Sequence, residues 1–303
     1  MQIIKEKLSW VDILKPTADD LAFLKTIESF HPLVLEELQS PSVRSRAEIH
    51  GRYLFLVYHL PVYRQESKTS EKAEVDFLVT KDRLITVHYE FLSQLDEFVL
   101  RLQNQPHFKE AALGETTGHL LYYLLQQFNE FTLRQMTHID EDIDYISKNV
   151  FARREKELLE KISYVKRNVV NFKLIVEPQA VILNSLKEVG SDFWREAAGT
   201  INPYLADLIG DHARVVDKIE NNFQIIESLE ETNAQLLAAK TNDTMKTLSI
   251  MALLTFPLAL YTAVYDIGPG RELLDDLFGG FWNGFGVFFL LTLLSVWLSE
   301  RKL

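Results

Sequence analysis

Eight residues near the end of the sequence are spaced so that they would lie along one face of a helix and could contact an ion. They recur at alternating intervals of three and four residues, and most are small or polar: Asn242, Met245, Ser249, Ala252, Phe256, Ala259, Ala263 and Asp266. Small side chains let helices approach or leave a lumen open, and polar side chains can replace water around an ion. The stripe therefore predicts the lining of an ion pathway, with plain helix packing as the alternative.

Asp266 is the carboxylate of this stripe, and it follows a long apolar segment. A carboxylate at the end of a membrane span is costly unless it faces water, a partner or a cation, and the C-terminal end of a helix adds negative potential. A bound cation would relieve both penalties. The alternative is a carboxylate that lies just beyond the hydrocarbon and is solvated.

The rest of the sequence has no pattern typical of catalysis. The histidines form no HExxH pair, no GxxxxGK[ST] loop or nucleophile motif is present, and the glycine pair Gly284 and Gly286 lies inside an apolar run. We therefore expect no enzyme, no catalytic residue and no organic cofactor. The absence of cysteine excludes disulfides and thiolate zinc sites. A net charge of −11 argues against nucleic acid as a partner and suits cations.

Two apolar segments could position these residues in a lipid bilayer. Residues 248–265 and 281–298 each contain eighteen residues without a charge. As helices they would span about 27 Å, close to the roughly 30 Å hydrocarbon layer. We expect two transmembrane helices, with a pair of buried helices in a soluble core as the alternative.

Charges beside these segments predict their orientation. Lys240 and Lys246 precede the first segment and Arg301 and Lys302 follow the second, whereas the connecting loop, residues 266–280, has only Arg271. The positive-inside rule then places both termini in the cytoplasm. The chain would cross the inner (plasma) membrane twice. The loop would present an acidic rim, formed by Glu272, Asp275 and Asp276, to the outside. No signal-peptide pattern opens the sequence, which begins with a strand-like run.

The residues before the spans predict an α/β or α+β module followed by helices. Short β-branched or alternating runs occupy residues 54–57, 75–79 and 84–88, and Thr17 can cap a helix that starts with acidic residues. From Thr116 onwards apolar residues recur at helical spacing. We expect a domain at residues 1–200 whose second half is helical, a stalk helix at 201–247, spans at 248–265 and 281–298, and a tail at 299–303.

The stalk and the first span would form one helix of about 64 residues, residues 202–265, nearly 100 Å long. Its polar part is amphipathic near heptad spacing. A helix of this length cannot pack within one small domain, so we expect it to pair with copies of itself.

Several segments in order along nearly the whole chain resemble the CorA family of divalent-cation transporters. The most specific is KTNDTMKTL at residues 240–248, and the others are WVD at 10–12, HPLVLEE at 31–37, FLVTKDRLITV at 77–87 and YLADL at 204–208, followed by Asp211 and His212. The resemblance implies a homopentamer with a cytosolic α/β/α funnel, a stalk helix that continues as the pore-lining first span, and an outer ring of second spans.

The resemblance also assigns roles to individual residues. Asn242, Leu248 or Ser249, Phe256 and Ala259 would line the pore. Glu37 and Asp207, with Glu36 nearby, would hold regulatory cations between neighbouring subunits. Mg²⁺ would be both regulator and cargo, with Zn²⁺ or Co²⁺ as alternatives.

One motif departs from the family pattern. After the first span the family has Tyr-Gly-Met-Asn, whereas this chain reads YDIG at residues 265–268. A ring of Asp266 carboxylates would replace the family's asparagines as the entry filter. The alternative is a non-conducting relative that serves as a cation-responsive sensor or membrane scaffold, which the bulky Phe256 at the constriction and the lost tripeptide favour.

Overall fold

The structure is a computed structural model that describes residues 1–42 and 44–300, with side chains up to Trp297. The chain divides into two compact units, Met1–Glu231 and Thr232–Leu303. The first contains a sheet and its covering helices, and the second contains only helices among its described residues.

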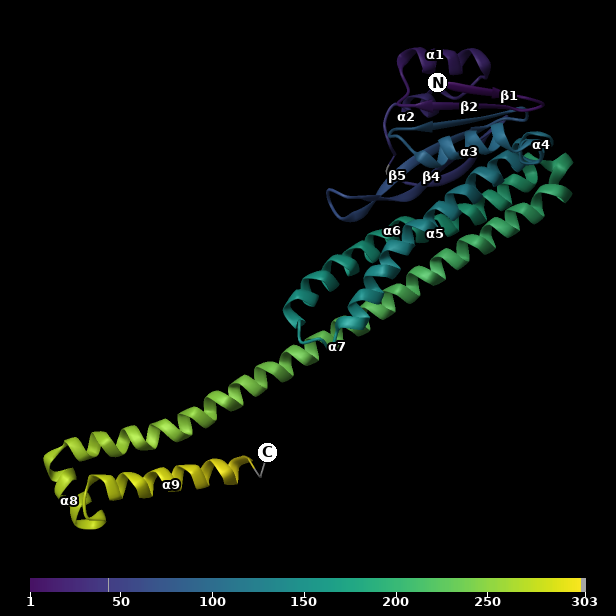
Figure 1. Ribbon diagram of the computed structural model, residues 1–303. Helices are drawn as coiled ribbons and strands as arrows, with labels where there is room; N and C mark the ends of the chain where they lie inside the picture. Colours follow the sequence, from purple (N-terminus) through teal and green to yellow (C-terminus); the bar gives the residue numbers. More distant parts are fainter. Residues whose placement is uncertain (43, 301–303) are drawn as a thin grey trace. The chain divides into compact units, whose positions relative to one another are not determined.

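A six-stranded mixed sheet forms the centre of the first unit (Figure 1). Its strands lie in the order β1-β2-β6-β5-β4-β3, and β2 and β6 run parallel while the other neighbours run antiparallel. The bounds are β1 Gln2–Lys5, β2 Ser9–Leu14, β3 Arg46–His50, β4 Tyr53–Arg64, β5 Thr69–Val79 and β6 Arg83–His88. The three predicted strand segments lie within β4, β5 and β6, so these predictions are confirmed.

Helices cover both faces of the sheet. Side chains alternate across each strand, so Trp10 and Leu54 join one core cluster while Val11 and Phe55 join the other. The second cluster is closed by α1 (Ala18–Ile27) and α2 (Pro32–Glu37), and the first by α3 (Ser93–Asn104), α4 (Pro106–Leu113) and the long helices (Figure 1). This is the expected α/β/α arrangement.

The start of α1 confirms the predicted cap. The Thr17 hydroxyl accepts from the Asp20 amide at 3.2 Å, and the Asp20 carboxylate accepts from the Thr17 amide at 2.9 Å. This reciprocal pair is a capping box, which satisfies two amides that a helix start would otherwise leave unpaired. The Thr17 amide and the Thr17 hydroxyl both donate to the Asp20 carboxylate, and these two bonds lower the pKa of Asp20.

Long helices follow the sheet. They are α5 (Thr117–Asn149), α6 (Glu155–Phe193), a short 3₁₀ turn η1 (Arg195–Ala197) and α7 (Ala198–Asp266), which has 69 residues. A third core cluster, which includes Met136, Phe172 and Ile219, joins α5, α6 and the first part of α7. The expectation of one very long helix is confirmed, and α7 begins four residues before the predicted Asn202.

The second unit contains the end of α7, then α8 (Gly268–Phe278) and α9 (Phe281–Glu300). α7 is long and apolar enough to cross a membrane, and α8 with α9 pass the same test as a pair bent by 77°. The segment expected as a connecting loop thus contains the eleven-residue helix α8. Arg301 and Lys302, used to predict orientation, lie outside the described residues.

Candidate functional site

The predicted stripe lies on α7 and is exposed along its whole length in the single chain. Asn242, Met245, Ser249, Ala252, Phe256, Ala259, Ala263 and Asp266 are all exposed, as is Leu248. Phe256 is the bulkiest of them, with 71% of its surface exposed. No element of the second unit packs over this face among the described residues.

A different face of α7 packs against α9, and Tyr261 is at its centre. Tyr261 is 2% exposed, its hydroxyl donates to the Phe281 carbonyl at 2.9 Å, and its ring lies 5.1 Å from that of Phe288. Tyr261 and Ala263 point about 200° apart around the helix, at about 100° per residue. The α9 contact therefore leaves the stripe uncovered.

Gly284 makes the contact between α7 and α9 close. A Cβ atom at Gly284 would lie 2.2 Å from the Tyr261 hydroxyl oxygen, whereas one at Gly286 would meet nothing within 4 Å. Small residues allow membrane helices to approach in this way. The glycine pair noted in the sequence therefore contains one packing position, Gly284, and one unconstrained position.

The polar side chains on and near the stripe differ in what they have available for an ion. Thr241, Thr244 and Thr247 donate their hydroxyls to carbonyls four residues earlier in α7, each at 2.9 Å. Within the described part of the chain, Asn242 and Ser249 make no hydrogen bond with their side chains. The Asn242 carboxamide and the Ser249 hydroxyl are therefore available to a hydrated ion.

Asp266 is the last residue of α7, and its carboxylate is exposed. The neighbouring cation, Arg271, lies 3.8 Å from the Asp275 carboxylate, which also accepts from the Tyr265 hydroxyl at 2.7 Å. Over the residues that the structure describes, Asp266 has no ion-pair partner. The carboxylate at the predicted pore mouth is therefore free to meet a cation.

The predicted regulatory carboxylates lie in the first unit. Glu36 and Glu37 are exposed at the end of α2, and Glu37 forms an ion pair with Arg46 of β3. Asp207, exposed on α7, accepts from the Tyr122 hydroxyl at 2.8 Å, and burial together with this carboxylate raises the pKa of Tyr122. The described chain has no group of three His, Asp or Glu residues placed to hold a metal ion. The cation pairing predicted between subunits stays a prediction.

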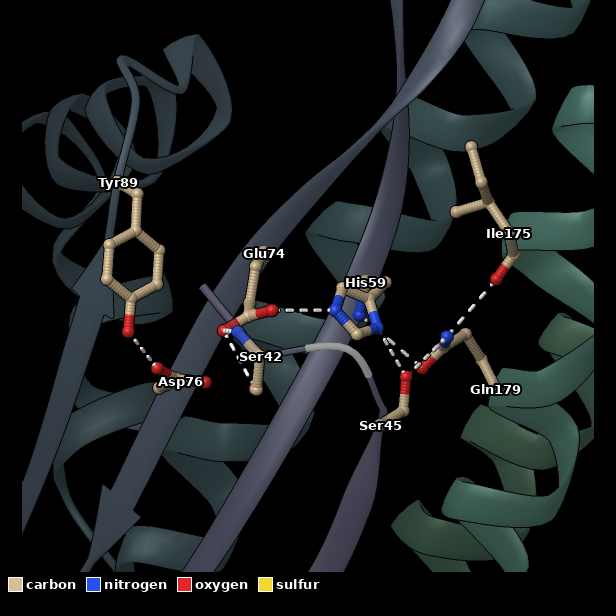
Figure 2. Close-up of polar contacts among 8 residues, drawn as sticks. All are labelled: Ser42, Ser45, His59, Glu74, Asp76, Tyr89, Ile175 and Gln179. Carbon is tan, nitrogen blue, oxygen red and sulfur yellow. Dashed lines mark hydrogen bonds and ion pairs between the residues drawn. The ribbon is translucent and has the colours of Figure 1, made fainter. Parts of the chain in front are cut away.

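Sequence reasoning missed a buried polar cluster between β4 and β5, which Figure 2 shows. His59 lies directly opposite Glu74 in the strand register, and its Nε2 donates to Glu74 at 2.8 Å. Asp76 is two residues further on the same strand and accepts from the Tyr89 hydroxyl at 2.6 Å. The available signal was the alternation of Glu74 and Asp76 with the apolar residues Ala73, Val75 and Phe77.

A family profile described as a CorA-like Mg²⁺ transporter protein matches residues 5–299. The chain belongs to this family. This membership confirms the resemblance to the CorA family of divalent-cation transporters found in the sequence.

CorA proteins of two organisms are among the similar sequences. The cobalt/magnesium transport protein CorA of Thermotoga maritima is 25% identical over 251 residues, which cover 82% of this chain and 68% of that protein. The protein of the same description from Methanocaldococcus jannaschii is 18% identical over 302 residues, covering 98% and 91% of the two chains.

Solved structures confirm the CorA fold. The complete CorA magnesium transporter from Methanocaldococcus jannaschii superposes with a TM-score of 0.74 at 16% identity, covering 97% of this chain and 92% of that chain. The full-length CmaX protein gives a TM-score of 0.66, also at 16% identity, with 88% and 80% covered. The fold class is therefore an α/β/α domain, a long helix and two C-terminal transmembrane helices.

Proposed function

We propose that this CorA protein forms a homopentameric pore in the lipid bilayer through which divalent cations pass, with Mg²⁺ as the first candidate and Co²⁺ or Zn²⁺ next. The observation that carries the proposal is that two opposite faces of α7 have different surroundings. Tyr261 packs on α9, and the opposite stripe, from Asn242 to Asp266, stays exposed in the single chain. Copies of α7 that turn this stripe towards a common axis would line a passage with small and polar groups.

The wall of the proposed passage changes character along its length. At one end Asn242 and Ser249 offer a carboxamide and a hydroxyl that have no other described partner. Phe256 forms the narrow apolar part, followed by Ala259 and Ala263. Polar rings of this kind can hold a cation through its water shell, and an apolar constriction can gate by excluding water.

The far end of the passage is formed by Asp266. Five copies would form a ring of carboxylates two residues before Gly268, which stands where the family has asparagine, and this ring would replace the asparagines as the entry filter. Such a ring favours cations over anions and binds divalent ions more strongly than monovalent ions, because the attraction scales with the charge of the ion. The cobalt/magnesium relatives support the choice of cargo.

The orientation follows from charge. We infer that the first unit and both termini lie in the cytoplasm and that α8, with Asp275 and Asp276, faces the outside of the inner membrane. Lys240 and Lys246 next to the first span support this orientation.

A regulatory role is proposed for the carboxylates of the first unit. A cytoplasmic Mg²⁺ would bridge Glu37, assisted by Glu36, to Asp207 of the neighbouring subunit and hold the stalks closed. Both carboxylates are exposed, as a contact between subunits requires. Glu37 would have to exchange its present partner, Arg46, for the ion.

Uptake by the purified protein in liposomes tests the pore proposal. A panel of Mg²⁺, Co²⁺, Zn²⁺ and Na⁺ is measured for the wild type, for Asp266→Asn, and for the control Glu272→Gln, which neutralises an exposed carboxylate on α8. We expect Asp266→Asn to lower divalent uptake and the preference over Na⁺, and the control to leave both unchanged. Equal uptake and selectivity in all three proteins would remove the Asp266 ring from the proposal.

The second candidate function is a non-conducting sensor or scaffold. It is favoured by Phe256, whose five copies could close the passage. Ion flux separates the candidates, because a sensor would carry no flux in the wild type. Phe256→Ala sharpens the test: a closed passage would gain flux, whereas an open one would change its rate only modestly.

A further inference from the structure

Three ionisable side chains are buried together in the first unit, whereas every residue assigned above to the ion pathway belongs to the second unit. His59, Glu74 and Asp76 are 3%, 4% and 2% exposed, and all lie on the same face of β4 and β5 (Figure 2). Charged groups are rarely buried this deeply unless they are paired. The cluster therefore needs a physical account.

Glu74 is fully paired as a carboxylate. It accepts from His59 at 2.8 Å and from the amide and the hydroxyl of Ser42 at 2.8 Å and 3.0 Å. Although burial opposes ionisation, these hydrogen bonds lower the pKa of Glu74. Glu74 therefore keeps its negative charge in the folded chain.

Asp76 is only half paired. One oxygen accepts from Tyr89 at 2.6 Å, but the other, Oδ1, is buried and has no partner within the described structure. A buried carboxylate oxygen without a donor is costly, whereas a protonated oxygen becomes a donor. Glu74, two residues away on the same face, is an acceptor for it. Burial, reinforced by the charge of Glu74, raises the pKa of Asp76 to about 8.

The cluster connects the sheet to two other elements. His59 Nδ1 lies 2.5 Å from the Ser45 hydroxyl, which accepts from Gln179 of α6 at 3.0 Å. Ser42 and Ser45 belong to the connection between α2 and β3. Figure 2 thus shows two separate sets of hydrogen bonds: one joins Tyr89 to Asp76, and the other runs from Ser42 through Glu74, His59 and Ser45 to Gln179 of α6.

The other charged side chains near the cluster belong to β3, to β5 and to the residues between α2 and β3. From β3, Arg46 attracts Asp76 while it forms ion pairs with Glu37 of α2 and, at 3.9 Å, with Glu48. From α6 the nearest polar side chain is the neutral Gln179. Arg44 and Lys72 line a pocket of about 340 Å³ that reaches His59, Ser45 and Gln179. This pocket gives water a route to the cluster.

We propose that Asp76, Glu74 and His59 form a buried proton-binding site, and that the proton on Asp76 keeps Ser42 and Ser45 held against the sheet. Loss of this proton to water leaves two adjacent buried carboxylates, of which Glu74 is paired with His59, while the cation that attracts Asp76, Arg46, is already paired with Glu37. Their repulsion is relieved when Ser42 and Ser45 move away and water enters. The site is a pH-sensitive latch in the first unit, and it does not rest on the proposed pore.

The direction of the pH effect follows from linkage. Asp76 has an ordinary pKa of 3.8 when it is exposed and about 8 in the closed latch. Opening therefore releases one proton between these values, so the opening equilibrium rises by about tenfold per pH unit and becomes flat above about pH 8. The pKa of Glu74 is lowered, so this residue titrates below that range and leaves the slope unchanged.

Hydrogen–deuterium exchange of the full-length protein in nanodiscs tests the latch, with the Ser42 amide as the reporter because it donates to Glu74. Exchange is measured from pH 5.5 to 9 and divided by the intrinsic rate at each pH. We expect the opening constant of the wild type to rise about tenfold per pH unit and to level off near pH 8. Asp76→Asn supplies a permanent N–H donor in place of the proton, so its opening constant should not change with pH.

Two further variants complete the test. Glu71→Gln, an exposed position on the same strand, should keep the wild-type slope. Tyr89→Phe removes the hydrogen bond that favours ionised Asp76, so the plateau should begin at higher pH. If Asp76→Asn does not fold, the shift of the plateau to higher pH in Tyr89→Phe tests the proposal in its place. A flat profile in the wild type, a wild-type slope in Asp76→Asn, or a plateau that Tyr89→Phe leaves in place would each overturn the proposal.

Discussion

In the unit Met1–Glu231, the aromatic side chains of Phe77, Phe128 and Phe172 are almost completely buried, whereas in the unit Thr232–Leu303 most large apolar side chains, including Phe256 and Trp282, are exposed. Among the described residues of the second unit, Tyr261 and Leu274 are the buried large apolar side chains. The first unit thus completes its core within one chain. The second has a surface that suits lipid and further copies, so its structure depends on what surrounds it.

The largest expected effect is a loss of stability on replacing a buried phenylalanine, with an exposed phenylalanine as the comparison. Phe172→Ala should lower the free energy of unfolding of the first unit by about 3–5 kcal/mol, because it leaves a cavity in the cluster between α5, α6 and α7. Phe256→Ala should change it by less than about 0.5 kcal/mol, as exposed substitutions usually do.

Tryptophan fluorescence during urea unfolding measures both variants. Trp10 and Trp194 are buried in the first unit, so a background with Trp282→Phe and Trp297→Phe reports that unit alone. Equal losses of stability in the two variants would contradict the contrast between the units.

An intermediate effect is expected at the contact between α7 and α9. Gly284→Ala forces a methyl group onto the Tyr261 hydroxyl and should destabilise the helix pair by about 1–3 kcal/mol, the usual range for overpacking. Gly286→Ala, with open space around it, is the matched control. Thermal stability in detergent, followed by the fluorescence of Trp282, measures both, and a control as unstable as Gly284→Ala would show that the close contact is not the cause.

The smallest effect concerns two tyrosines that donate to carboxylates, one in each unit. Tyr122→Phe should cost about 1 kcal/mol, because a buried ring loses its hydrogen bond to the exposed Asp207. Tyr265→Phe, which removes the corresponding hydrogen bond to Asp275, should cost less because that site is more exposed. Unfolding of both variants is compared under one set of conditions, and a larger loss for Tyr265→Phe would reverse the comparison.

Much of the fold could be predicted from local patterns. Thr17 followed by Asp20 predicted the start of α1, and alternating apolar residues predicted β4, β5 and β6. The start of α7 could not be predicted as well. α7 begins at Ala198, before the predicted stalk, and Ile201 in its first turn is buried against Gly118 and the core; such tertiary contacts are not visible in periodicity. Residues 266–280 were expected to be a loop because they separate the two apolar spans, but Pro269 suits the first turn of a helix, here α8.

The candidate site was predictable only in part. The spacing of Asn242, Ser249 and Ala259 indicated one helix face, but the sequence could not reveal that α9 packs on another face, because this depends on the contact of Tyr261 with Gly284. His59 and Glu74 are fifteen residues apart and meet only through the register of β4 and β5. A register is set by the whole sheet, so no local motif indicates the cluster.

The parallel pairing of β2 with β6 joins the earliest part of the sheet to its last strand, which ends at His88. The first apolar span starts near Leu248, far downstream. A ribosome that synthesises this chain therefore releases all six strands before it makes any residue destined for lipid. Since domains generally fold in the order of their synthesis, insertion into the bilayer should follow the assembly of the sheet and not precede it.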